Sequence, residues 1–189
     1  MRLFVAIELS AEVKAALRDT QRALAAFDRA VRWVNSDQMH LTLKFLGEVP
    51  DGRVEEICAT TASVAGTSSA FEMLVGGCGC FPPKGTVRVV WVGVDEPRGL
   101  LATCSTLCEA EYEKIGFARE HRPFSPHLTL GRVREDRTGG KLREAVSGVH
   151  VASCRQGANE LCVVQSTLTP HGAKYAVVSR HPFGGAQSG

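Results

Sequence analysis

The chain has 189 residues, of which 44% are hydrophobic and 22% charged, and its formal net charge at pH 7 is +2. This length suits one domain, or two lobes sharing a core, and no apolar run is long enough for a membrane span. Such a small net charge excludes a protein that coats nucleic acid by bulk electrostatics. We expect a cytoplasmic monomer with one two-lobed domain over residues 1–183 and a disordered tail over 184–189.

The N-terminal half contains hydrophobic patterns of both strand and helix type. They predict a strand over residues 2–9, a helix over 11–27, a short strand over 32–34, a strand over 40–46 and a helix over 52–65. Ser10 and Asp51 stand just before the two helices, and both are residue types that cap helix N-termini. We therefore expect them to be the N-caps.

The C-terminal half continues this alternation of strands and helices. It predicts extended segments near 70–77 and 87–94, a helix over about 98–115, a strand beginning at His127, a short helix near 141–147, and strands over 159–168 and 174–180. The turn-rich Phe81–Gly85 joins the first two segments, and a hairpin turn around Thr169–Gly172 joins the last two.

The tetrapeptide His-Leu-Thr-Leu occurs twice, at residues 40–43 and 127–130. Alternation of apolar and polar residues predicts a strand in each case, and residues i and i+2 of a strand share a face. The histidine and threonine of each copy should therefore project together, while the leucines face the core. Two such strands side by side would hold two imidazoles and two hydroxyls around one small space, which suits acid–base chemistry on an anion.

Two other interpretations of the repeat remain open. The copies could be ordinary half-buried strands with a polar face, or their histidines could bind a metal. Threonine is a poor zinc ligand and no carboxylate lies within the motif, so we expect neither a metal nor a cofactor.

Arg132 follows the second motif after Gly131. In a regular strand Arg132 has the wrong parity to share a face with His127, but Gly131 could permit a bulge that turns its side chain toward the site. The planar guanidinium suits a phosphate, although a surface arginine is the alternative. The surrounding stretch 116–143 is basic. Its charged residues are Arg119, Arg122, Arg132, Arg134, Arg137, Lys141 and Arg143 against Glu120, Glu135 and Asp136.

Seven cysteines are scattered along the chain without a paired C-x-x-C framework. We expect reduced cysteines that pack as small hydrophobes. A zinc site made by Cys78, Cys80, Cys104 and Cys108 is the remote alternative.

The two motifs are separated by close to half the chain, and each lies in a predicted strand. This spacing favours an α+β fold of two similar lobes. Each lobe would be an antiparallel sheet flanked by helices, the two lobes would be related by an approximate two-fold axis, and the active-site cleft would lie between them.

These residues resemble the two-histidine (2H) phosphoesterase superfamily, and within it the bacterial and archaeal RNA 2′,3′-cyclic phosphodiesterases, also called 2′-5′ RNA ligase-like proteins. The similar segments are Arg2–Leu9, Val31–Val34, His40–Val49, Arg122–Arg134 and Gln165–Pro170. Two positions depart from the family pattern. Thr167 stands where many relatives have a basic residue, which puts an auxiliary RNA contact in doubt. Cys78-Gly79-Cys80 replaces a segment that usually combines glycine with apolar residues.

The resemblance implies hydrolysis of an RNA terminal 2′,3′-cyclic phosphate to a 2′-phosphate. It implies that His40 is the proton donor to the leaving 3′ oxygen and His127 the proton acceptor from water. Thr42 and Thr129 would bind the non-bridging oxygens, and Arg132 would offset developing charge. Phe45 would either stack on a nucleobase or pack in the core.

The same resemblance implies RNA ends, tRNA fragments among them, as partners, and an ATP-independent 2′-5′ ligation in reverse. Three alternatives remain at this stage. They are a 2H enzyme acting on a small cyclic nucleotide, one acting on ADP-ribose cyclic phosphate, and a non-catalytic module that binds RNA ends.

Overall fold

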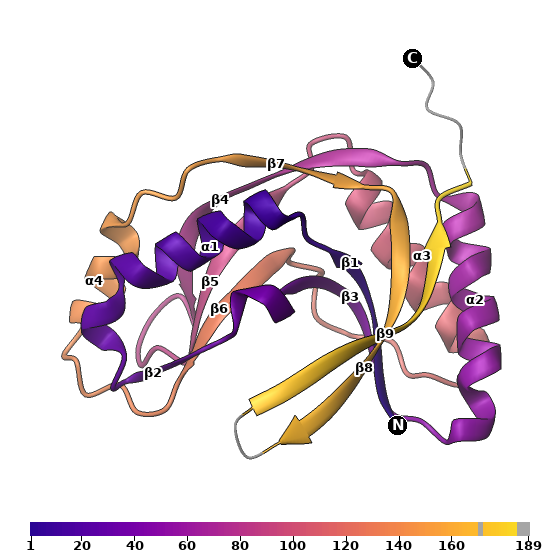
Figure 1. Cartoon of the computed structure of the whole chain (residues 1–189), viewed down its shortest axis with the longest axis horizontal. Coiled ribbons are helices and arrows are strands. Elements are labelled where there is room, and N and C mark those ends of the chain that lie inside the picture. The colour runs from indigo at the N-terminus through magenta and orange to yellow at the C-terminus, as the bar shows by residue number, and fades with distance from the viewer. Residues whose placement is uncertain (170–171, 185–189) are drawn as a thin grey trace.

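A computed structural model describes residues 1–169 and 172–184 and contains two antiparallel sheets (Figure 1). The first sheet has the order β3-β1-β8-β9, with β1 (Arg2–Glu8), β3 (His40–Glu48), β8 (Glu160–Thr169) and β9 (Gly172–Pro182). The second has the order β2-β6-β5-β4-β7, with β2 (Val31–Trp33), β4 (Phe71–Phe81), β5 (Val89–Asp95), β6 (His127–Val133) and β7 (Cys154–Ala158). The expected α+β fold is confirmed.

In the described part of the chain, four helices cover the sheets: α1 (Ala11–Ala23), α2 (Val54–Thr67), α3 (Leu100–Lys114) and α4 (Lys141–Gly148). Helix α2 packs on β8, β9 and α3, and α3 contacts β3, so both lie against the first sheet. Helix α1 contacts β7 and α4 contacts β4, on the second sheet. Figure 1 shows these two pairs at opposite ends of the molecule.

The two sheets repeat one arrangement around the motif strands. From β3 outward the order is β3-β1-β8-β9, and from β6 outward it is β6-β5-β4-β7, with β2 added on the free side of β6. The motif strand is thus followed by three antiparallel neighbours in both lobes. This is the similarity of lobes that the spacing of the motifs predicted.

Several predicted boundaries were wrong. The helix expected over 11–27 ends at Ala23 and continues as a 3-10 turn over Ala25–Phe27. Asp51 does not cap α2, because it opens another 3-10 turn (Asp51–Arg53) and α2 begins at Val54 without a side-chain cap. Ser10 is confirmed as the N-cap of α1, since its Oγ accepts a hydrogen bond from the Val13 amide at 3.2 Å.

Strand β7 was missed, and β4 runs further than predicted. The sequence of β7, Cys-Arg-Gln-Gly-Ala, has little β propensity, although its burial alternates as the pairing with β4 requires. Strand β4 continues to Phe81 through a register shift at Gly77, whose φ is 68°. Two further expectations lie outside the described residues: the turn at 170–171, and the tail apart from Gly184.

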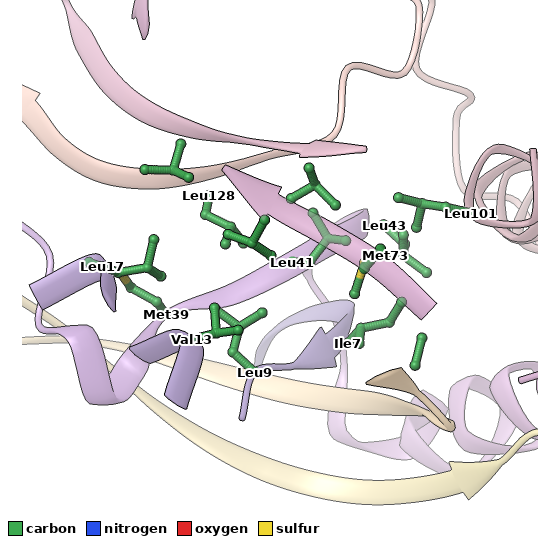
Figure 2. Close-up of a cluster of buried hydrophobic side chains, with 14 of the residues drawn as sticks. Ile7, Leu9, Val13, Leu17, Met39, Leu41, Leu43, Met73, Leu101 and Leu128 are labelled. Atoms are coloured by element: carbon green, nitrogen blue, oxygen red, sulfur yellow. The ribbon is translucent and has the colours of Figure 1, made fainter. Parts of the chain in front are cut away.

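One hydrophobic cluster joins the two sheets. Leu41 and Leu43 from the first motif and Leu128 and Leu130 from the second are all buried in it. Figure 2 shows Leu41, Leu43 and Leu128 among side chains from β1, α1 and α3. The leucines of both motifs therefore face the core, as the strand parity predicted, which leaves the other face of each strand for polar residues.

Within residues 1–169 and 172–184, no helix is long and apolar enough to cross a membrane.

Candidate active site

The two motif strands, β3 and β6, belong to different sheets and contact each other. The two motif strands therefore lie next to each other, as expected, although they are not paired within one sheet. In both strands the histidine and threonine are half-buried while the intervening leucines are buried. In each strand the histidine and threonine therefore lie on the face opposite the buried leucines.

Both motifs contain a bulge at their fourth residue. Ala6 pairs with Thr42 and Val5 with Lys44, so Leu43 has no partner residue on β1. In the second sheet Trp91 pairs with Thr129 and Val90 with Gly131, so Leu130 has none on β5. Each bulge shifts the parity of the strand by one residue.

This shift places the sixth residue of each motif on the same face as the motif's histidine and threonine. Directly paired residues point to the same side of a sheet, and Phe45 pairs with Phe4, two residues from Ala6. Arg132 likewise pairs with Val89, two residues from Trp91. Phe45 and Arg132 are therefore equivalent positions. The bulge suggested by Gly131 is confirmed, and it lies at Leu130.

The two imidazoles are oriented by the same hydrogen bond. His40 Nδ1 lies 2.9 Å from the Gln38 carbonyl oxygen, and His127 Nδ1 lies 2.7 Å from the Ser125 carbonyl oxygen. A carbonyl can only accept, so Nδ1 carries the proton in both rings. Nε2 is then the free nitrogen, and in the neutral ring it can accept a proton.

His40 lies in an aromatic cluster formed by Phe4, Phe45 and Tyr175. Its ring stacks on Phe4 at a centroid distance of 4.4 Å and meets Tyr175 edge-on at 4.8 Å. Burial lowers the pKa of His40 below its ordinary value, against the opposing effect of the Gln38 carbonyl. Lys14 lowers this pKa further and Glu8 raises it.

His127 meets a different pair of aromatic rings. Phe81 lies edge-on to His127 at a centroid distance of 5.1 Å, and Phe81 is 5.2 Å from Trp91. Trp91 pairs with Thr129, so its ring lies on the same face of the second sheet as Thr129. The Trp91 indole nitrogen is buried and has no hydrogen-bond partner among the described residues.

The expected phosphate ligands have no competing partners in the described part of the chain. The hydroxyls of Thr42 and Thr129 make no hydrogen bond there, and the exposed Arg132 makes no ion pair. Phe45 is 65% exposed, so the alternative that it packs in the core is wrong. These groups are available to a ligand.

Lys44 is a missed residue directly behind the site. It follows the bulge at Leu43, is only 4% exposed, and forms an ion pair with Glu109 of α3 at 2.5 Å. Lys44 also donates to the Ala118 carbonyl at 2.6 Å, while Glu109 accepts from the Glu120 amide. The pair therefore ties β3 to the segment that leads toward His127. A buried lysine next to an apolar run has no recognisable sequence signal.

Three of the seven basic side chains in the stretch 116–143 form ion pairs in the described part of the chain. Arg119, Arg122 and Arg137 pair with Glu113, Glu120 and Glu135 respectively. Arg143 donates instead to three carbonyl groups of the turn at Pro82, Pro83 and Gly85. These four arginines therefore already have partners within the protein.

Potential metal ligands gather at one place among the described residues, where Glu8, Glu160 and Cys162 lie together. Arg180 occupies that cluster, with ion pairs to Glu8 at 2.6 Å and to Glu160 at 2.5 Å. The four cysteines considered for zinc do not form such a group, so that alternative is wrong. All seven cysteines are free, and five of them are buried.

Comparison with known proteins agrees with this geometry. A family model described as LigT like Phosphoesterase matches residues 7–91. The chain is 34% identical over 178 residues to the RNA 2′,3′-cyclic phosphodiesterase of Methanothermobacter thermautotrophicus, covering 93% of this chain and 95% of that protein. It is 31% identical over 185 residues to the Thermotoga maritima protein of the same name, covering 98% and 97%.

Solved structures share the whole fold. A crystal structure of a Thermus thermophilus protein matches with a TM-score of 0.82 and 28% identity, covering 98% of this chain and 99% of that one. Escherichia coli LigT complexed with 3′-AMP matches with a TM-score of 0.75 and 25% identity, covering 96% and 97%.

Proposed function

The chain belongs to the LigT-like phosphoesterases of the 2H superfamily, and on that basis we propose that it hydrolyses the 2′,3′-cyclic phosphate of an RNA end to a 2′-phosphomonoester. Relatives that cover nearly the whole chain bear the name RNA 2′,3′-cyclic phosphodiesterase. The observation that carries the proposal is the matched orientation of His40 and His127. Each ring has Nδ1 fixed by a carbonyl and Nε2 free, on strands with the same bulge.

Opening the cyclic phosphate requires two proton transfers. In the proposed step, His127 Nε2 takes a proton from water as the water oxygen attacks phosphorus. The bond from phosphorus to the ribose 3′ oxygen breaks, and that oxygen takes a proton from Nε2 of protonated His40. The products are a 3′-hydroxyl and a 2′-phosphate, and proton exchange with solvent restores both histidines.

The lowered pKa of His40 bears on this division of roles. In the free protein burial favours neutral His40, whereas a proton donor must start charged. A phosphate bound beside the ring favours the charged form, because an opposite charge within a few ångströms raises the pKa of a histidine. Substrate binding would thus raise the pKa of His40, so that His40 takes up the proton that it then donates.

The remaining groups on the two faces would hold the phosphate and the base. The hydroxyls of Thr42 and Thr129, which have no partner among the described residues, can donate to the non-bridging oxygens, and Arg132 can stabilise the charge that develops on them. Phe45 presents an exposed ring on the His40 side, where a nucleobase can stack. The similar E. coli LigT was crystallised in complex with the mononucleotide 3′-AMP.

The decisive experiment incubates the purified chain, in EDTA, with an RNA ending in a 2′,3′-cyclic phosphate and identifies the product. We expect a 2′-phosphate, and we expect its formation to disappear in His40→Ala and in His127→Ala. His150→Ala is the matched control, because His150 is an exposed histidine outside both motifs. Undiminished turnover in both motif variants, or a 3′-phosphate product, would contradict the proposal.

The same assay separates the other activities considered. Faster turnover of nucleoside cyclic monophosphates or of ADP-ribose cyclic phosphate would assign a small-molecule substrate. Tight binding of the RNA end without turnover would assign a binding module. We further propose that the chain acts in the cytoplasm as a monomer on RNA ends such as tRNA fragments, and that reversal of the step joins RNA ends by a 2′-5′ bond without ATP.

A further inference from the structure

Arg32 lies directly opposite Arg132 across the β2–β6 ladder. The neighbouring pair is Trp33 opposite Gly131, and Val31 and Trp33 occupy the space that a Cβ on Gly131 would need. Val31 and Trp33 therefore point to the core side of the sheet. Arg32, between them, points to the other side, which is the side of His127, Thr129 and Arg132.

Two arginines in this position repel each other. Directly opposed residues of an antiparallel pair have Cβ atoms about 4.5–5.5 Å apart, and like charges there destabilise a sheet. Both side chains are exposed, and neither has an acidic partner in the described ranges 1–169 and 172–184. Arg119, Arg122 and Arg137, by contrast, all have glutamate partners.

We infer that Arg32, together with Arg132, binds the internucleotide phosphate next to the terminal nucleotide of an RNA substrate. The inference rests on the proposed function and specifies its substrate as an oligonucleotide rather than a mononucleotide. A negatively charged phosphodiester lying between the two guanidinium groups attracts both of them and offsets their mutual repulsion. Each planar guanidinium can donate two hydrogen bonds to it.

The order of the groups along the face supports this assignment. Thr129 and Arg132 lie on β6 on either side of the bulge, and Arg32 lies one strand further out, about 4.8 Å away at the backbone. The terminal phosphate belongs at His127 and Thr129. Arg132 can reach that phosphate and the next one, whereas Arg32 lies on the outer strand, beyond Arg132.

The test compares the binding of two product-like ligands, uridine 2′-phosphate and the dinucleotide UpU bearing a terminal 2′-phosphate, by calorimetry. We expect the unchanged chain to bind the dinucleotide about tenfold more tightly, which is the ratio that one charged contact supplies. In Arg32→Gln this ratio should fall to about two, with the mononucleotide affinity nearly unchanged. The slope of log affinity against log salt for the dinucleotide should fall by about 0.7.

Arg29→Gln is the matched control, because Arg29 is an exposed arginine of the preceding turn that lies outside the ladder. It removes the same charge and should keep the dinucleotide preference. Arg32→Lys keeps the charge without the fork and should retain part of the preference. Without ligand, Arg32→Gln should melt at a higher temperature than the unchanged chain, since the repulsion is gone.

Three results would overturn the inference: no dinucleotide preference in the unchanged chain, equal weakening of both ligands in Arg32→Gln, or the same loss in Arg29→Gln. None of these measurements requires turnover. Loss of the proposed hydrolysis with an intact Arg32-dependent preference would therefore reject the enzyme assignment alone. Intact hydrolysis without that preference would reject the role of Arg32 alone.

Discussion

The imidazole ring of His40 stacks on the phenyl ring of Phe4, with the two planes inclined by 25°. Phe4 also belongs to a small buried cluster with Ala6, Cys162 and Val164. His127, in contrast, meets Phe81 edge-on, with the planes inclined by 83°. Two histidines in identical tetrapeptides thus have dissimilar surroundings, and this difference has consequences that can be measured.

The first consequence is a pH-dependent stability. Burial lowers the pKa of His40 and that of His181 in the folded chain. At a pH between the folded and unfolded pKa values, the unfolded chain therefore binds more protons than the folded chain. Stability should be full above the unfolded pKa of about 6.5 and decline as pH falls through the folded values. Urea denaturation at pH 5, 6 and 7 measures this slope. His40→Gln should flatten it and His150→Gln should not; an unchanged slope in His40→Gln would contradict the role of burial.

The second prediction distinguishes the acid from the base by the leaving group. His40→Ala should slow opening of the RNA cyclic phosphate by about 10²–10⁴-fold, the usual contribution of a general acid. With an aryl phosphodiester that releases nitrophenolate the loss should be much smaller, because that oxygen leaves without a proton. His127→Ala should be impaired on both substrates. The opposite pattern in the two variants would exchange the roles.

The third prediction concerns Phe45. Its exposed ring contributes little to the core, so Phe45→Ala should leave the melting temperature nearly unchanged. It should weaken binding of uridine 2′-phosphate by about 1–3 kcal/mol if the ring stacks on the base. Leu168→Ala, at a side chain that is 70% exposed on β8, is the control. If Phe45→Ala bound uridine 2′-phosphate as tightly as the unchanged chain does, the base would have to lie on another surface.

The fourth prediction tests the buried ion pair behind the site. Lys44→Met leaves the Glu109 carboxylate without its partner, which costs about 3–5 kcal/mol of unfolding free energy for a pair this buried. The double variant Lys44→Met with Glu109→Leu should recover most of that loss. Chemical denaturation of the single and double variants measures the coupling. Additive losses would show that the two side chains act independently.

The fifth prediction concerns Gly131. A Cβ there would lie 2.5 Å from Val31 Cγ1 and 2.7 Å from Trp33 Cε3, so Gly131→Ala must shift these side chains of β2, which flank Arg32. We expect a loss of about 1–3 kcal/mol and weaker binding of the UpU dinucleotide, since β2 carries Arg32. Gly148→Ala, where a Cβ meets nothing within 4 Å, should fold normally. A stable Gly131 variant with full binding would contradict the close packing.

Strand parity was sufficient to predict which faces the motifs present. It placed His40 and Thr42 together, buried the four leucines, and allowed a bulge near Gly131, all of which the structure confirms. The aromatic partners could not be predicted, because Phe4 and Tyr175 reach His40 from distant strands through sheet pairing alone. Phe81 and Trp91 reach the second site in the same way. The burial of Lys44 depends on a bulge that local sequence does not encode. The site roles themselves remain predictions that the experiments above address.

Phe45 and Arg132 occupy equivalent positions but differ in chemistry, and this difference makes the two lobes distinguishable to a ligand. Two identical lobes, each with one copy of the motif, would bind a ligand equally well in either of two reversed orientations. An aromatic ring at the sixth position of one motif and a guanidinium at the sixth position of the other remove that ambiguity. If the base lies on Phe45 and the charged backbone on Arg132, a nearly symmetric fold can distinguish the 3′ end of a strand from its 5′ end.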